Sequence, residues 1–440
     1  MMFRYTNMYA LWWLLCFGLV ADVLANQQTK LIVFLVDGLR WDYVDIQQHQ
    51  GFRWLTQNGV KAHHVVPIVP ANSYPNWYSI VTGLYAEEHG MLQNYMYDSD
   101  KSSYFRMSSP SSFLPYWWDQ AEPLWVRAEK RNIRTAMFWW DGCQVPLQGI
   151  KPSFCIPYKG TWSTVNDDVK YNIGAVMTAF KAGSLDMALI YYEGPDAAGH
   201  AYGPDSMETR RSVDSFNDIL MHLQKELLSR QLDKSVNVVV LSDHGMTNTG
   251  AHDVTLINLE SFLASEDIHI MLDKGPFSML HPVPGKEEQV YEKLKAANIP
   301  GLEVMQREEI PDYFHFRNNR LAAPILLTTK KGYYLMPLSD ARKMDPPPSS
   351  SIPRGSHGYN PLEVPDMWAS FYAGGPGISK LGQTQPIHMV DIYNVLCYLV
   401  GLPPHGNSGS WRRVRNVIDP TYNRPLFVEY DRFFLQRRNA

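Results

Sequence analysis

The stretch KLIVFLVDG at residues 30–38 decides the fold class. It is a continuous apolar run that ends at Asp37, and two similar runs occupy residues 187–192 and 236–241. Such runs are typical of parallel strands that are buried on both faces. Between the second and third runs, apolar residues recur every third or fourth position from Val213 to Leu227, as in an amphipathic helix. The sequence therefore predicts an α/β fold whose mostly parallel sheet lies between helices.

The remainder of the chain supplies further helices and one less regular region. Helices are predicted over residues 167–182, 286–297 and 389–402. Residues 258–353 mix strand and helix signals, and we interpret them as a small inserted subdomain over the core. The segment MDPPPSSSIPRGS, residues 344–356, has the proline and serine content of an irregular loop, and it leads directly into His357.

The N-terminus predicts export. Arg4 precedes an apolar run over residues 9–20, and Val23-Leu24-Ala25 provides a small-residue cleavage pattern. We therefore expect residues 1–25 to be a signal peptide and residues 26–440 to be one domain. No second long apolar stretch follows, so the mature chain is expected to be soluble, without a stable membrane span, and periplasmic or secreted. The sequence has no N-x-[ST] sequon, which mildly favours a bacterial origin.

Charge and cysteine content narrow the function classes further. The formal net charge is −4 and the basic residues are dispersed, so no nucleic-acid-binding surface is evident. Cys143 and Cys155 flank a short proline-containing loop, and in an exported protein we expect them to form a disulfide. Cys397 lies in an apolar run and is interpreted as a buried free thiol. The oligomeric state stays open.

Six ligand-type residues stand in distinctive short contexts. Two of these contexts, with Asp37 and Asp243-His244, directly follow apolar runs, and ligands collect at the carboxyl ends of strands in open α/β sheets. Asp37 alone would indicate only a turn, and Asp196 with His200 only a helix cap and a surface histidine, whereas the adjacent pair Asp243-His244 is a stronger signal. Together, three carboxylates and three imidazoles are sufficient for two zinc ions with three protein ligands each and open positions for substrate. The six are Asp37, Asp196, His200, Asp243, His244 and His357.

Ser73 occupies the position of a candidate nucleophile. Pro75 is suited to the first turn of a helix, so Ser73 is expected at or near the helix cap. A plain capping serine is the simpler interpretation of this stretch alone. A helix N-terminus also presents free N–H groups to a phosphate, and a zinc ion beside the hydroxyl would lower its pKa without a histidine base. The constellation as a whole therefore predicts two-metal phosphoryl transfer.

With these motifs the chain resembles the ectonucleotide pyrophosphatase/phosphodiesterase family of the alkaline phosphatase superfamily. The motif contexts run in family order from about Leu31 to Val400. The resemblance implies an alkaline-phosphatase-like core and Asn94, in GMLQNYMYD, as a contact to the phosphoryl oxygens. It implies one zinc ion held by Asp37, Ser73, Asp243 and His244. It implies a second zinc ion held by Asp196, His200 and His357.

The preferred substrate of this centre stays open on the sequence. Nucleotide-cleaving relatives usually carry K-T-F-P-N where this chain has residues 72–76, NSYPN. The serine nucleophile, NYM, EPLWV at residues 122–126 and the Cys143/Cys155 pair are closer to the choline-phosphodiester-cleaving members, yet residues 67–72 lack the acidic residue expected there. Tyr74 and Tyr158 would instead stack on a base.

We therefore predict a two-zinc phosphodiesterase that cleaves phosphodiester or pyrophosphate bonds of nucleotide-type small molecules through a phosphoserine intermediate. One alternative is a choline-specific glycerophosphodiesterase or lysophospholipase C-type hydrolase. A second alternative among enzymes is a phosphomonoesterase. The third alternative is a catalytically silent binding protein on the same fold, which the complete ligand set and the intact Ser73 hydroxyl argue against.

Overall fold

A central eight-stranded sheet forms the core of the protein. The computed structural model describes residues 30–158, 160, 163–347 and 352–436, so the predicted signal peptide lies outside the described residues. The sheet order is β20-β2-β19-β9-β1-β8-β6-β7, and only β19 runs antiparallel to its neighbours. The strand bounds are β1 Lys30–Val36, β2 Gly59–Ala62, β6 Thr135–Phe138, β7 Phe154–Ile156, β8 Met187–Tyr192, β9 Val236–Leu241, β19 Phe371–Gly374 and β20 Gly382–Thr384.

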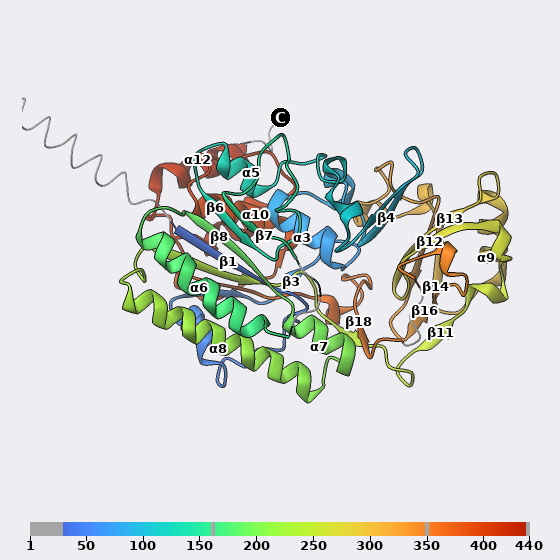
Figure 1. The fold of residues 1–440 in the computed structure, drawn as a ribbon, viewed down its shortest axis with the longest axis horizontal. Coiled ribbons are helices and arrows are strands. Elements are labelled where there is room, and N and C mark those ends of the chain that lie inside the picture. Colours follow the sequence, from blue (N-terminus) through green and yellow to red (C-terminus); the bar gives the residue numbers. More distant parts are fainter. Residues whose placement is uncertain (1–29, 159, 161–162, 348–351, 437–440) are drawn as a thin grey trace, which may run out of the picture.

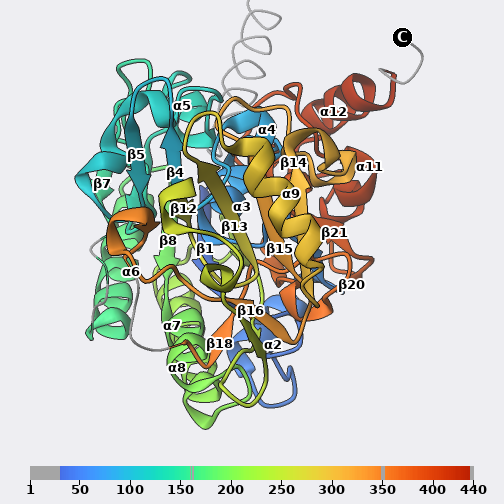
Figure 2. The ribbon, with the colours of Figure 1, turned by 90° about the vertical axis from the view of Figure 1, so that its right-hand side faces the viewer.

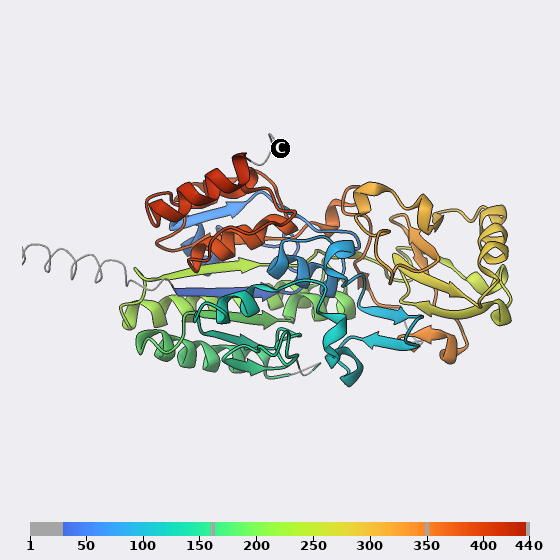
Figure 3. The ribbon, with the colours of Figure 1, turned by 90° about the horizontal axis from the view of Figure 1, so that it is seen from above.

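Helices cover both faces of this sheet, as the view from above shows (Figure 3). The long α6 and α8 lie on one face and the C-terminal α10 and α12 lie on the other (Figure 1). Strands β1, β8 and β9 are buried along their whole length, because both faces are packed. The helix bounds are α2 Gln50–Gln57, α3 Ser73–Thr82, α4 Ala86–His89, α5 Leu124–Glu129, α6 Val165–Lys181, α7 Gly194–Tyr202, α8 Met207–Ser229, α10 Ile392–Leu399, α11 Trp411–Val414 and α12 Arg424–Gln436.

A second, five-stranded sheet stands beside the carboxyl ends of the core strands (Figure 1, right). Helix α9, Glu287–Ala297, packs on it, and Figure 2 shows this helix in front of the sheet. A separate hydrophobic cluster that includes Leu280, Leu294 and Leu327 stabilises the unit. We propose that this unit is the inserted subdomain predicted over residues 258–353. Its strands are β12 Ile268–Leu272, β13 Phe277–Pro282, β14 Leu302–Gln306, β15 Ile325–Thr329 and β17 Met344–Asp345.

In the described part of the chain, four separate two-stranded sheets fix loops around the two larger sheets. The hairpin of β4 (Tyr95–Asp98) and β5 (Ser103–Arg106) lies against the second sheet. The pairs β11–β16 (Thr255–Ile257 with Tyr333–Leu335) and β3–β21 (Val65–Val66 with Ile387–His388) fix further loops. The antiparallel pair β10–β18 joins Thr247–Asn248 to Gly355–Ser356. This last pair brings the loop that carries His357 next to the end of β9.

The α/β fold with a mostly parallel sheet is confirmed, and the three apolar runs form the strands that were predicted. Cys143 and Cys155 are joined in a disulfide, and Cys397 is a buried free thiol. The helix predicted over residues 389–402 is shorter, because a 3-10 turn precedes α10 and the chain leaves the helix after Leu399. Among the described residues, no helix has the length and apolar character needed to cross a bilayer.

Candidate metal centre

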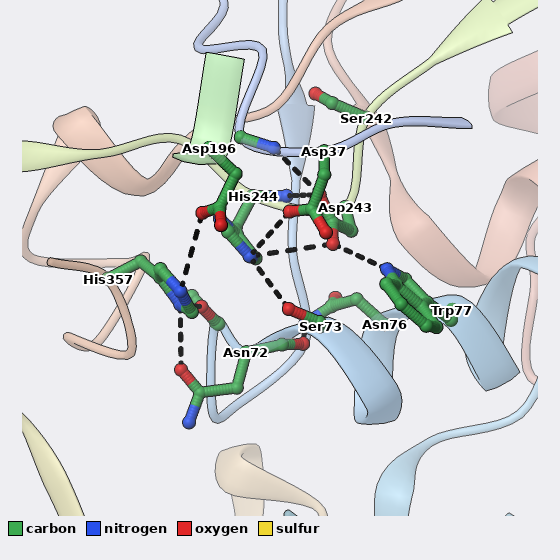
Figure 4. A network of polar contacts seen from close by, with 12 residues as sticks. Asp37, Asn72, Ser73, Asn76, Trp77, Asp196, Ser242, Asp243, His244 and His357 are labelled. Atoms are coloured by element: carbon green, nitrogen blue, oxygen red, sulfur yellow. Dashed lines mark hydrogen bonds and ion pairs between the residues drawn. The ribbon is translucent and has the colours of Figure 1, made fainter. Parts of the chain in front are cut away.

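The first group of candidate ligands lies where β1 and β9 end. Asp37 follows β1 directly, and Asp243 and His244 follow β9 after a single serine. Their ligand atoms all lie within 4.8 Å of one another. Nε2 of His244 is 3.4 Å from Oδ1 of Asp37 and 3.4 Å from Oδ2 of Asp243. Adjacent parallel strands thus bring Asp37 together with Asp243 and His244, which lie more than 200 residues later in the sequence (Figure 4).

The second group is centred on Asp196 and shares His244 with the first. Asp196, in the first turn of α7, lies together with His244 and His357 within the same 4.8 Å limit. Nε2 of His200, four residues along α7, is 3.3 Å from Oδ1 of Asp196, and Nε2 of His357 is 3.7 Å from it. The rings of His244 and His357 stack at a centroid distance of 3.6 Å. All six predicted ligands therefore converge on one continuous site.

The three imidazoles are held in the same tautomer. Nδ1 of His244 donates to the carbonyl oxygen of Gly245 at 2.9 Å, Nδ1 of His200 to that of Gly355 at 2.8 Å, and Nδ1 of His357 to that of Ala71 at 3.0 Å. A carbonyl oxygen can only accept, so the proton of each neutral ring sits on Nδ1. Each Nε2 therefore offers a lone pair to the site, which is the arrangement that metal-binding histidines use.

The carboxylates carry the electrostatic signature of a cation site. Oδ1 of Asp37 and Oδ1 of Asp196 are buried atoms without a hydrogen-bond partner. Burial raises the pKa of Asp37 well above its usual range, and the nearby charges of Asp243 and Asp196 raise it further. Burial also works against the charge of Asp196, but His200 and His357 outweigh it and hold the pKa of that carboxyl below its ordinary value. Two orphaned carboxylate oxygens facing three imidazole lone pairs fit divalent metal ions.

Two aromatic side chains that the sequence did not single out hold the carboxylates in place. The hydroxyl of Tyr191 donates to Oδ2 of Asp37 at 2.7 Å, and the indole Nε1–H of Trp77 donates to Oδ2 of Asp243 at 2.6 Å. These contacts leave the other oxygen of Asp37 aimed at the site. Trp77 lies one helical turn after Ser73, so its spacing could have indicated that it shares the face of Ser73.

Ser73 begins α3 and meets the first ligand group. Its Oγ lies 3.3 Å from Nε2 of His244, and the side chain is buried. Asn94 stands close by, because its Oδ1 accepts the backbone N–H of Tyr74 at 2.9 Å. Asn72, the cap residue of α3, accepts from Nδ1 of His357 at 2.9 Å through its Oδ1. The start of α3 is therefore bound to both ligand groups (Figure 4).

The structure corrects one predicted substrate contact. The ring of Tyr74 is only 1% exposed, stacks on Trp77, and donates its hydroxyl to Asp141 at 2.5 Å. The prediction that Tyr74 stacks on a base is wrong, because the ring turns into the core at the first turn of α3 and both of its faces are packed. Tyr158 is half-buried beside Tyr191 and donates its hydroxyl to Glu193 at 3.3 Å.

Comparison with known proteins identifies the family. The family model of type I phosphodiesterase / nucleotide pyrophosphatase matches residues 31–360. The chain belongs to this family. Its members are phosphoric diester hydrolases, and the family assignment made from the motifs is confirmed.

Three similar proteins show how far the likeness extends. Human bis(5'-adenosyl)-triphosphatase ENPP4 is 31% identical over 403 residues, which cover 91% of this chain and 84% of the relative. Human ectonucleotide pyrophosphatase/phosphodiesterase family member 7 is 30% identical over 395 residues, 87% of this chain and 82% of the relative. The solved structure of murine ENPP5, an inactive threonine-to-alanine variant with AMP, superposes with a TM-score of 0.80 at 28% identity and covers 89% of this chain and 100% of that chain. These relatives are mammalian and give no support to a bacterial origin.

A cavity of about 160 Å³ adjoins the candidate metal centre on the side that faces the second sheet. We call it the intersheet cavity. Burial raises the pKa of Asp273, one of its lining residues, to about 6. Sequence patterns gave no signal for this residue, because it lies in a turn of the second sheet far from every motif. The cavity is lined by Asn72, Asn94, Tyr95, His200, Asp273, Lys274, Pro276, Phe277, Tyr334, Pro346, Pro353, Ser356 and His357.

Proposed function

We propose that this protein is an exported two-zinc phosphodiesterase that cleaves phosphodiester or pyrophosphate bonds of nucleotide-type substrates through a phosphoserine at Ser73. The observation that carries the proposal is the position of Ser73, whose Oγ lies 3.3 Å from Nε2 of His244, the residue that the two candidate ligand groups share. Each group also holds a buried carboxylate oxygen without a hydrogen-bond partner. The nucleotide class is supported by the family and by relatives named for nucleotide substrates.

One metal ion would be held by Asp37, Ser73, Asp243 and His244, and the other by Asp196, His200 and His357. Zinc ions bound there would supply the charge that lowers the pKa of the serine hydroxyl and neutralises the oxygens of the phosphoryl group. The tautomer set by the Nδ1–H bonds keeps each Nε2 available as a ligand.

The chain's own groups orient the reaction. Oγ of Ser73 releases its proton to solvent and attacks phosphorus in line, so that an Oγ–phosphorus bond forms. The bond to the departing oxygen breaks as that oxygen takes up a proton from solvent. Oδ1 of Asn94 accepts from the Tyr74 N–H, so its amide Nδ2 is the group that donates to a phosphoryl oxygen. Water then hydrolyses the phosphoserine and restores the hydroxyl. We propose Tyr158 as the wall against which the retained nucleoside stacks.

The test compares three chromogenic substrates with the zinc-loaded protein: the p-nitrophenyl esters of AMP and of phosphorylcholine, and p-nitrophenyl phosphate. We expect the AMP ester to be preferred. Ser73→Ala should lose more than about a thousandfold in kcat while it retains zinc, because the covalent step needs Oγ. The matched control is Ser229→Ala, at the exposed end of α8. Preference for the choline ester would refute the substrate class, and activity retained by Ser73→Ala would refute the nucleophile.

A further inference from the structure

The intersheet cavity begins at the second ligand group and ends at the second sheet. His200 and His357 form its inner wall, and the turn between β12 and β13 forms its outer wall with Asp273 and Phe277. It therefore lies where a substrate that reaches past the phosphoryl group would have to extend.

The side from which Ser73 attacks phosphorus determines which part of the substrate enters this cavity. Ser73 lies beside the first ligand group, whereas His357 and Asp196 lie on the far side of His244 (Figure 4). In an in-line displacement the attacking and departing oxygens are on opposite sides of phosphorus. If Ser73 is the nucleophile, as in the proposed function on which this step rests, the departing oxygen faces His200 and His357. The group attached to that oxygen then enters the intersheet cavity.

The charges that line the cavity do not favour a polyphosphate there. Asp273 lines the cavity together with Tyr95 and Tyr334. Burial first, and then the charge of Asp273, raise the pKa of both phenols. Lys274 is the one lysine or arginine among the described lining residues. Burial lowers the pKa of its ammonium, and the adjacent carboxylate of Asp273 offsets its positive charge in the cavity. The other outer walls are aromatic rings and prolines. A departing diphosphate would bring several negative charges to a carboxylate, whereas a nucleoside or other uncharged alcohol would meet flat apolar surfaces.

The turn that carries Asp273 is fixed in shape. Asp273 has a φ of +66° and Gly275 a φ of +79°, and a Cβ at Gly275 would lie 2.8 Å from the ring of Tyr334. The carboxylate is thus presented by a backbone that few residues other than glycine, asparagine and aspartate adopt. Asparagine tolerates the same conformation, so Asp273→Asn removes the charge while it preserves the turn.

We propose that the intersheet cavity binds the leaving group and that Asp273 makes it selective for uncharged alcohols over polyphosphates. The enzyme would accordingly prefer phosphodiesters from which a nucleoside or similar alcohol departs. It would cleave bis(5'-adenosyl) triphosphate, the substrate in the name of the ENPP4 relative, less efficiently. Asp273 is a specificity-determining residue in this account, since it contacts the departing group and none of the reacting atoms.

The test uses two substrates that leave the same adenylyl group on Ser73. Adenosine departs from adenylyl-(3'→5')-adenosine, whereas ADP departs from diadenosine 5',5'-triphosphate. For each substrate kcat/KM is measured at pH 8 with the zinc-loaded wild type and Asp273→Asn. The intrinsic reactivity of each leaving group cancels when the variant is divided by the wild type. We expect Asp273→Asn to raise the triphosphate/diester ratio of kcat/KM by about tenfold, because one repulsive charge is removed from the path of ADP.

Two further measurements separate this inference from the proposed function. Asp312→Asn, which removes an exposed carboxylate elsewhere in the second-sheet unit, should leave the ratio unchanged. A ratio in Asp273→Asn within twofold of the wild type would overturn the leaving-group role, although the phosphodiesterase would stand. Absence of adenylyl transfer from both substrates in every form, with zinc bound, would refute the proposed function and this inference with it.

Discussion

The sharpest perturbation of the candidate metal centre is the removal of a single hydroxyl at Tyr191. Tyr191 and Tyr192 are consecutive residues of β8, so their side chains point to opposite faces of the sheet. Both are buried, at 3% and 1% exposure. The hydroxyl of Tyr191 donates to Oδ2 of Asp37 at 2.7 Å, whereas that of Tyr192 donates to Asn166 at 2.8 Å, away from the ligands. Tyr191→Phe and Tyr192→Phe are therefore chemically identical changes with different consequences.

The magnitude follows from the charge on the acceptor. Burial, Asp243 and Asp196 already raise the pKa of Asp37, and the Tyr191 hydroxyl opposes that rise. A hydrogen bond to a charged group contributes about 1.5–3 kcal/mol, and its loss makes the ionised carboxylate that a metal requires harder to form. We expect Tyr191→Phe to weaken zinc binding by about 10- to 100-fold at pH 7, within the range for groups that orient metal ligands.

The assay is competition for zinc against a chelating dye, together with urea unfolding of both metal-free variants. Tyr192→Phe should change the zinc Kd by less than about twofold. Each variant removes one buried hydroxyl, and the urea midpoints establish that both remain folded under the conditions of the zinc assay. If the two variants had the same zinc Kd, the hydrogen bond to Asp37 would have no part in metal binding, and the reasoning would be refuted.

Three further predictions concern other parts of the structure. Trp77→Phe removes the indole donor to Asp243, so zinc should bind about tenfold more weakly; an unchanged Kd in the dye competition would contradict this. Replacing Cys143 and Cys155 together by serine opens a short loop and should cost about 2–4 kcal/mol in urea unfolding; equal midpoints would contradict it. Burial lowers the pKa of His89 to about 3. Because the imidazole of the unfolded chain has a pKa of about 6.5, the free energy of unfolding should decrease as the pH falls from about 6.5 through about 3. In His89→Gln this decrease should be smaller than in the wild type.

The sequence predicted the core because its signals there are local. Each buried parallel strand is a continuous apolar run, and the carboxylate at its end marks the edge where ligands meet, so β1 and β9 with Asp37 and Asp243 could be placed without coordinates. The Nδ1–H bonds of His200 and His357, the Tyr191 donor and the position of Asp273 depend on contacts between segments far apart in the chain. Such contacts produce no periodic pattern in the sequence from which they could be predicted.

Tyr74 shows the opposite case, in which a local pattern suggested the wrong role. Its position next to Ser73 suggested a wall of the substrate site, but the direction of a side chain at the first turn of a helix is set by what packs there. Trp77 stacks on the ring and Asp141 accepts the hydroxyl, and these two contacts turn Tyr74 into the core. Trp77 lies three residues after Tyr74 in the same helix, so helical spacing could have paired these two rings, but spacing gave no signal for Asp141.

The most direct test of the central claim is the metal content of the protein after zinc loading and removal of free metal. The account predicts two zinc ions per chain by elemental mass spectrometry. It also predicts about one zinc ion per chain for Asp37→Ala and for Asp196→Ala, since each loses the carboxylate of one ligand group. One zinc ion or fewer in the wild type, or two in both variants, would contradict a two-metal centre built on these residues.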